Sequence, residues 1–186
     1  MKANLSVLFL LLFFATTGLS AQRAAALEFT GYHKNVTVDL LGSNVLLGLS
    51  YDMRLQRGRM DGLGFRAGFG GFSANAISGD GFGNARVSVV TFPLEVNHIV
   101  GKRRSGFVSG AGLLPIYASG SYQSTEDNLV SEGEGFGLAG GFATLGYRFQ
   151  PLRTGVTFQL NWNPMVLRGS GFVPGWVGLN VGVGFK

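Results

Sequence analysis

The sequence contains no cysteine, so neither a disulfide framework nor a thiolate metal site can form. Histidine is almost as scarce, with only His33 and His98 among 186 residues. Charged residues make up 13% of the chain, against about 25% in an average globular protein. The formal net charge is +5, and the one dense basic run is Lys102-Arg103-Arg104. Because nucleic-acid-binding proteins gather basic residues on one face or in a long run, we expect no nucleic-acid binding.

Long hydrophobic runs are missing except near the N-terminus. There, Lys2 precedes an apolar run from Leu5 to Ala15, and small residues follow at Ser20-Ala21. A membrane-spanning helix needs about 18 to 20 apolar residues, so this shorter run indicates a secretory signal peptide rather than an anchor. We place the cleavage after Ala21, and Ala24 to Ala26 offer a second site. The predicted organisation is a signal peptide over residues 1–21, a short N-terminal segment over 22–32 and a single domain over 33–186.

What the chain has in abundance is glycine, with 31 residues, together with a hydrophobic fraction of 46% and 16 phenylalanines. Such a hydrophobic content is not typical of a disordered chain. Glycines recur too densely for long amphipathic helices, because glycine is unfavourable in a helix interior. The composition therefore favours strands.

Two segments near the C-terminus show the alternation of a strand with one apolar face. From Val177 to Phe185, apolar residues alternate with glycine and asparagine, and from Val156 to Asn163 they alternate with threonine, glutamine and asparagine. A soluble surface is about a quarter to a third charged, whereas these polar faces hold almost no charge. They suit the crowded lumen of a membrane barrel, with the apolar faces turned to lipid.

Further strands are recognisable upstream, although the alternation slips near Val89 and near Gly140, which we interpret as β-bulges. Short and long connections alternate between them, as periplasmic turns and extracellular loops do in outer-membrane barrels. The short connections are 56–60, 101–104 and 150–152, and the long polar ones are 73–84 and 123–134. The predicted upstream strands are Val36 to Leu41, Val45 to Leu55, Leu63 to Phe72, Arg86 to Ile99, Phe107 to Tyr122 and Gly135 to Phe149.

The first of these strands is needed for both ends of the domain to lie on the periplasmic side. Val36 to Leu41 supplies it, turning through Gly42-Ser43-Asn44 as a tight hairpin. The count then becomes eight. We therefore predict an all-β fold, an eight-stranded antiparallel up-and-down transmembrane β-barrel, located in the outer membrane.

Four motifs carry a resemblance to a known family. They are Val38-Asp39-Leu40-Leu41-Gly42 leading to Ser50-Tyr51-Asp52, Phe92-Pro93-Leu94-Glu95-Val96-Asn97, Gly146-Tyr147-Arg148-Phe149-Gln150-Pro151, and the ending in Phe185. Over roughly residues 33–186, the chain resembles uncharacterised outer-membrane β-barrel proteins of Bacteroidota, of the small OmpA- and OmpX-like type. The resemblance implies that the barrel-assembly machinery reads a final aromatic residue; here Lys186 follows Phe185, a small departure.

The lumen of an eight-stranded barrel is just wide enough for side chains to fill, so we expect no general aqueous channel. Charges inside such a wall are tolerable when they are paired or hydrated, so we predict an internal salt-bridge plug. The same residues could instead form a proton or ion path. The side chains predicted to point inward are Asp39, Asp52, Arg54, Arg66, Glu95, Asn97, Arg148, Gln159 and Asn161. Those predicted to form the polar network near the periplasmic turns are Asp52, Arg54, Arg66, Glu95, Asn97 and Arg148.

We predict no catalytic, cofactor or metal site. Lipid-modifying outer-membrane enzymes place histidine, serine and acidic groups near the outer leaflet, whereas His98 lies beside a predicted periplasmic turn and His33 lies near the N-terminus. Gly135-Phe-Gly137-Leu-Ala-Gly140 matches the dinucleotide-binding glycine pattern formally. That motif requires a following helix, and here a strand continues to Phe149.

In the predicted topology, acidic residues lie in the long extracellular connections and basic residues lie in the short periplasmic turns. Basic turns could contact anionic lipid headgroups, although we favour the interpretation that these charges are simply solvated. The acidic residues of the long connections are Asp80, Glu126, Asp127, Glu132 and Glu134. The basic residues of the short turns are Arg57, Arg59, Lys102, Arg103, Arg104 and Arg153.

We therefore expect a non-enzymatic, monomeric integral outer-membrane protein whose partners are membrane lipids, the assembly machinery and an unknown target of its loops. The alternatives are a narrow, porin-like channel for small solutes or lipophilic molecules, a lipid-modifying enzyme, and a soluble periplasmic lipid-binding barrel.

Overall fold

The computed structural model describes residues 33–77, 83–102, 104–124, 130–150 and 155–185. All of these belong to the second of two compact units, Gly31–Lys186. Among them, no helix has the length and apolar character required to cross a membrane. The predicted signal peptide, the segment 22–32 and the loop or turn residues Asp80, Arg103, Glu126, Asp127 and Arg153 lie outside the described residues.

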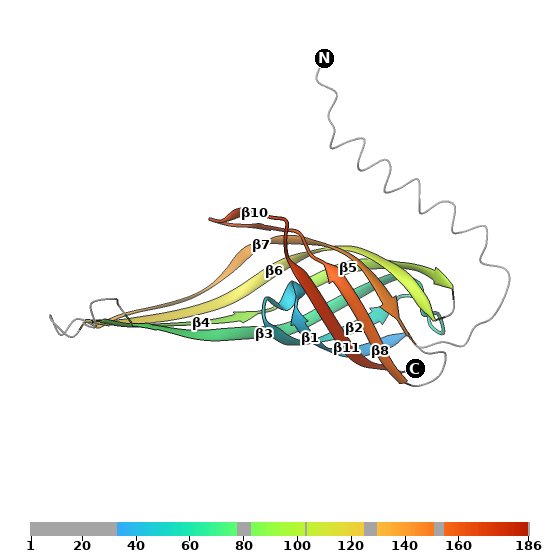
Figure 1. Cartoon of the computed structure of the whole chain (residues 1–186), viewed down its shortest axis with the longest axis horizontal. Helices are drawn as coiled ribbons and strands as arrows, with labels where there is room; N and C mark the ends of the chain where they lie inside the picture. The colour runs from blue at the N-terminus through green and yellow to red at the C-terminus, as the bar shows by residue number, and fades with distance from the viewer. Residues whose placement is uncertain (1–32, 78–82, 103, 125–129, 151–154, 186) are drawn as a thin grey trace, which may run out of the picture. The chain divides into compact units, whose positions relative to one another are not determined.

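The described residues form strands joined by short turns, with a 3-10 turn, η2 (Gly42–Asn44), between the first two strands (Figure 1). The strands are β1 (Lys34–Leu41), β2 (Leu47–Arg54), β3 (Gly62–Ile77), β4 (Gly83–Thr91), β5 (Leu94–Lys102), β6 (Ser105–Ser124), β7 (Val130–Phe149), β8 (Gly155–Trp162), β9 (Met165–Leu167), β10 (Gly171–Val173) and β11 (Val177–Phe185).

All strand pairs are antiparallel and each wall strand lies beside its neighbour in sequence, with β11 returning to pair with β1. Three wall strands are interrupted, so eleven segments make eight strands. The β4–β5 break is caused by Pro93, which has no N–H to donate; its carbonyl still accepts a bond from Gly68, and the register with β3 continues unchanged. Pro164 similarly separates β8 from β9, and residues 174–176 separate β10 from β11.

The wall is inside out compared with a soluble barrel. Outward-facing Leu49, Val96 and Leu160 are more than half exposed, whereas most of the buried side chains are polar. Phe69, Phe92 and Phe136 form an aromatic row on the outer surface, with neighbouring ring centroids 5.6 and 6.2 Å apart. Apolar bands with aromatic girdles are typical of membrane-spanning barrels. The fold prediction is confirmed: the chain forms an eight-stranded antiparallel up-and-down transmembrane β-barrel.

The predicted long loops are mostly wrong, because most of residues 73–84 and 123–134 are paired strand. They continue β3, β4, β6 and β7 beyond the points where β1, β2, β8 and β11 end (Figure 1). Cross-strand contacts hold them: Ser73 and Ser88 share a 2.9 Å hydrogen bond, and Arg86 donates to Asn75 at 2.9 Å. We call this region the projecting sheet; it comprises residues 72–77, 83–90, 116–124 and 130–138.

Of the two predicted bulges, one is confirmed and one is wrong. Near Gly140 the register shifts between Leu114 and Pro115, which leaves Ala139 without a partner on β6. Near Val89 the register of β4 is unbroken against both β3 and β6. The apolar pattern changes there because β4 lies beyond the barrel. The face of this wall strand that points into the lumen along β5 therefore no longer borders a polar interior along β4.

Candidate functional site

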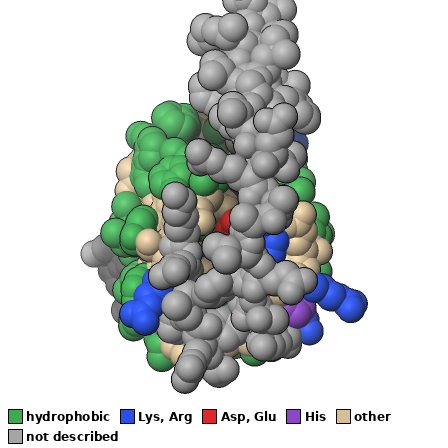
Figure 2. All heavy atoms as spheres, turned by 90° about the vertical axis from the view of Figure 1, so that its right-hand side faces the viewer, with side chains coloured by type: hydrophobic (Ala, Val, Ile, Leu, Met, Phe, Trp, Pro, Cys, Tyr) green, Lys and Arg blue, Asp and Glu red, His purple; other side chains and the backbone are tan. Residues whose placement is uncertain are grey.

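The polar interior of the barrel is the candidate site. All nine side chains predicted to point inward are buried, each no more than 4% exposed. Among the described residues, the buried charges are three arginines and three carboxylates, so the interior is formally neutral. Figure 2 looks toward the turn end of the barrel and shows hydrophobic side chains around its circumference, basic ones at its rim and an acidic group between them.

Asp52 lies at the centre of the half nearest the short turns. One of its carboxylate oxygens accepts a bond from Arg54 and the other from Arg148. Arg54 also donates to Asn97 Oδ1 at 2.5 Å. The structure thus joins four of the six residues of the predicted network directly. Gly64 makes this possible, because a Cβ at that position would collide with the Arg54 guanidinium.

Asp39 is the second centre, and it was absent from the six-residue network. Its Oδ2 lies 2.6 Å from Arg66 NH2, and Thr37 Oγ1 donates to its Oδ1 at 2.7 Å. Asn44, Ser50 and Asn180 also donate to this carboxylate. The alternation had placed Asp39 on the inward face of its strand, but it gave no signal for the partners that this carboxylate meets there.

Side-chain amides connect the two carboxylates across the lumen. Arg148 donates to Gln159 Oε1 at 2.5 Å, and Gln159 donates to Asn161 Oδ1 at 2.8 Å. Asn161 then donates to Asn180, which donates to Asp39. One hydrogen-bonded chain therefore runs through residues of β7, β8, β11 and β1. Such networks rigidify a core when every member is satisfied.

The turn η2 folds into the lumen instead of forming the tight hairpin that we predicted. Its three residues, Gly42, Ser43 and Asn44, are buried. Glycines on the facing strands provide the space, because a Cβ at Gly48 or Gly70 would lie within 3 Å of the Asn44 side chain. Asn44 was therefore missed as a lumen residue, since its position depends on glycines of β2 and β3.

Glu95 is the least satisfied group in the interior. It is the register partner of Arg66 on the adjacent strand, but neither of its carboxylate oxygens accepts a hydrogen bond from a described residue. Arg66 Nε also lacks a partner there. Glu95 and Arg66 are therefore the members of the predicted network that the structure does not join to the Asp52 centre by hydrogen bonds.

Buried side chains of the described residues lie at both ends of the lumen. At the turn end, Met60 and Gln150 cover the Asp52 centre, and the cavity beside it has a volume of only about 10 Å³, room for at most one water molecule. At the opposite end, Leu114, Phe142 and Met165 form a buried apolar cluster. Trp176 packs against this cluster and donates to the carbonyl of Gly42 at 2.9 Å.

Groups for catalysis do not converge in the described part of the chain. His98 is paired with Leu63 and Ser109 on the outer wall, and His33 lies before β1. No cluster of three or more histidine or acidic side chains that could hold a metal occurs among the residues the structure describes. The glycines from Gly135 to Gly140 lie within β7, without the helix that a dinucleotide site requires.

No family model matches the sequence, and no curated protein sequence matches it. Solved structures are similar at low identity. The attachment invasion locus protein Ail of Yersinia pestis, solved in complex with the heparin analogue sucrose octasulfate, is 8% identical with a TM-score of 0.46, over 81% of this chain and 93% of that one. CarO of Acinetobacter baumannii is 12% identical with a TM-score of 0.40, over 86% and 99%. Similarity at this level transfers no residue role, so the fold assignment rests on the strand pairing.

Proposed function

We propose that this chain is a non-enzymatic integral outer-membrane protein whose barrel is a closed anchor for the projecting sheet and the connections at its tips. The observation that carries the proposal is the inside-out wall around a neutral, hydrogen-bonded interior. In a soluble protein the exposed leucines and valines would form a continuous apolar belt in water, far larger than monomers tolerate. In a bilayer the same belt faces acyl chains.

The interior supports an anchoring role rather than transport. Buried ion pairs repay their desolvation only when the geometry is good and further hydrogen bonds satisfy the remaining polar atoms. Asp39 and Asp52 meet this condition, because each is paired with arginine and Asp39 also accepts hydrogen bonds from four amide or hydroxyl neighbours. Together with the buried apolar cluster around Phe142, they support a lumen that side chains fill.

The orientation follows from the ends of the barrel. His33 and Phe185 lie at the end of the short turns, which is periplasmic in such barrels, so the projecting sheet would lie outside the cell. Export by the signal peptide 1–21, insertion by the barrel-assembly machinery and a monomeric state complete the proposal. A Bacteroidota origin is also proposed, on the sequence motifs alone.

A narrow channel is the second candidate, and Glu95 is the observation that favours it. A buried carboxylate that accepts no hydrogen bond from a described residue, next to Arg66, is a group to which a passing proton or cation could bind. Conduction would also require the apolar cluster to open.

Bilayer recordings on the refolded mature protein separate the two candidates. We expect heat-modifiable mobility on a denaturing gel and β-rich circular dichroism in detergent, with no unitary conductance in planar bilayers. Steady conductance that disappears in a Glu95→Gln variant would overturn the closed anchor in favour of the channel. Recovery of the folded protein without detergent would overturn the membrane assignment itself.

A further inference from the structure

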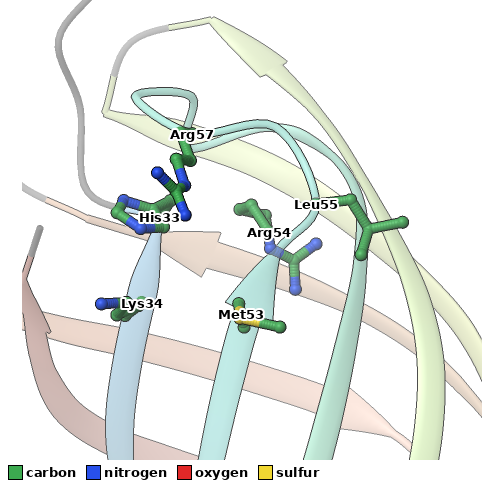
Figure 3. Close-up of a pocket in the computed structure, with 6 residues that line it drawn as sticks. All are labelled: His33, Lys34, Met53, Arg54, Leu55 and Arg57. Atoms are coloured by element: carbon green, nitrogen blue, oxygen red, sulfur yellow. The ribbon is translucent and has the colours of Figure 1, made fainter.

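A pocket of about 420 Å³ lies at the turn end of the barrel and borders the polar interior at Arg54. Four basic residues and no acidic residue line it, and two apolar side chains complete the wall (Figure 3). The lining residues are His33, Lys34, Met53, Arg54, Leu55 and Arg57. A volume of this size is within the range of small-molecule sites.

The basic groups differ in how far they are neutralised. Arg54 is buried and bonded to Asp52, so its charge is already compensated. Lys34 and Arg57 form no ion pair with a carboxylate of the described residues, whereas Arg59, in the same turn as Arg57, is paired with Asp61 at 2.9 Å. Among the described residues, no carboxylate compensates the charge of Lys34 or Arg57. Figure 3 shows His33 and Arg57 side by side above the start of β1.

His33 responds to this charge. Its pKa is lowered from the usual value by burial and then by the nearby cations Lys34 and Arg57. A bound anion would oppose the effect of both cations, so it would raise the pKa of His33. The pKa of His33 can therefore be used to measure anion binding in this pocket.

The apolar part of the lining faces the membrane side. Met53 is the cross-strand partner of Lys34, so both side chains lie on the outer surface of the wall, and Leu55 is 60% exposed two residues further along. The pocket thus combines cations at the edge of the barrel with apolar surface directed along the lipid-facing wall. Soluble anions need no such surface, whereas a lipid with a charged headgroup and acyl chains matches both parts.

We propose that this pocket binds the phosphate of an anionic phospholipid from the periplasmic leaflet, with Lys34, Arg57 and His33 on the phosphate and Met53 and Leu55 along the glycerol and upper acyl chain. The proposal rests on the membrane placement proposed above. The proposed site is specific, because only one of the two arginines of this turn lines the pocket. Arg57 lines it, whereas Arg59 is paired with Asp61.

The experiment uses the mature barrel in lipid nanodiscs, with the imidazole of His33 followed by NMR. A His98→Gln background leaves His33 as the only histidine. Replacing part of the phosphatidylcholine with phosphatidylglycerol should raise the pKa of His33 in a saturable way. Lys34→Gln and Arg57→Gln should each increase the lipid fraction needed for half-saturation about fivefold, as expected for loss of one cation near a membrane surface.

Arg59→Gln is the matched control, since it removes the same charge from the same turn but does not line the pocket. It should leave half-saturation unchanged. Equal weakening by Arg59→Gln and Arg57→Gln would show a diffuse surface charge and overturn the site. An equal response to inorganic phosphate in pure phosphatidylcholine discs would overturn the lipid assignment.

The same samples separate this proposal from the membrane assignment. If heat-modifiable mobility and β-rich circular dichroism are retained while phosphatidylglycerol leaves the pKa of His33 unchanged, the lipid site is wrong and the membrane barrel stands. If the protein does not enter the discs as a folded barrel, the membrane assignment is wrong.

Discussion

Strands β3, β6 and β7, and the wall strand made of β4 and β5, pass through two environments, and the same backbone pairing is stabilised differently in each. Within the barrel, their inward side chains are buried and joined to charges from other strands, as Arg66 is to Asp39. Within the projecting sheet, none of the side chains with a described burial is buried, and polar contacts join cross-strand neighbours, as Arg86 meets Asn75. Tight packing is therefore confined to the barrel, and tolerance of change is expected in the sheet.

The two regions also differ at their edges. The barrel has none, because β11 pairs with β1, whereas residues 130–138 of β7 pair only with β6. Glu132 and Glu134 lie on this open edge strand, and charged residues are a usual means of preventing edge-to-edge association. The barrel provides stability, while the sheet offers accessible backbone and side chains to a partner.

The largest effect is expected from Asp52→Asn. The change leaves Arg54 and Arg148 in the lumen without their shared carboxylate, and breaking a buried ion pair in this way costs about 3 to 5 kcal/mol. The measurement is the urea-unfolding free energy in lipid vesicles. Asp61→Asn, which removes the carboxylate of the exposed Arg59 pair, should cost no more than about 1 kcal/mol. Equal losses in the two variants would contradict the distinction between buried and exposed charge.

Gly64→Ala and Gly135→Ala compare the regions with the same chemical change. At Gly64 the new Cβ would meet the Arg54 guanidinium and the carbonyl of Met53, and neither can move freely, so we expect a loss of about 2 to 3 kcal/mol. At Gly135 it would meet no atom within 4 Å, so the change should lie within about 0.5 kcal/mol. The same unfolding assay applies, and a tolerated Gly64→Ala would show that the lumen is loosely packed.

Asn44→Ala tests the inserted turn. Its amide donates to Asp39 and to Ser50 Oγ at 3.1 Å, and removal leaves both acceptors with one bond fewer inside the lumen. We expect a loss of about 1 to 2 kcal/mol in unfolding free energy. Ser73→Ala, which removes one exposed hydrogen bond in the projecting sheet, should change it by less than about 0.5 kcal/mol. A neutral Asn44→Ala would mean that η2 fills space without stabilising the network.

The alternation of apolar residues was sufficient to predict the eight strands and the nine inward side chains. Successive side chains of a strand point to opposite faces, and one face of each wall strand lies in lipid. Only one of the two possible orientations of a strand therefore keeps charges such as Glu95 out of the bilayer. The outer part of the projecting sheet was missed because residues such as Ser73 and Asn75 give no apolar face, and their strands are held by pairing. The position of Asn44 and the bond between Asp39 and Asn180, 141 residues apart, depend on tertiary closure that no local pattern contains.

The smallest effect concerns Tyr117 in the projecting sheet. Its hydroxyl bonds to Glu134, and this hydrogen bond, followed by slight burial and the negative charge of Glu134, raises the pKa of Tyr117 above its usual value of 10.0. Because the raised pKa favours the protonated tyrosine in the folded state, the contact is retained below pH 10 and is lost as pH rises through the folded-state pKa. Glu134→Gln should therefore lower the pKa of one of the five tyrosines in an ultraviolet absorbance titration and leave the unfolding free energy unchanged. Measurable destabilisation by Glu134→Gln at neutral pH would mean that the sheet contributes to barrel stability and would remove the contrast between the two regions.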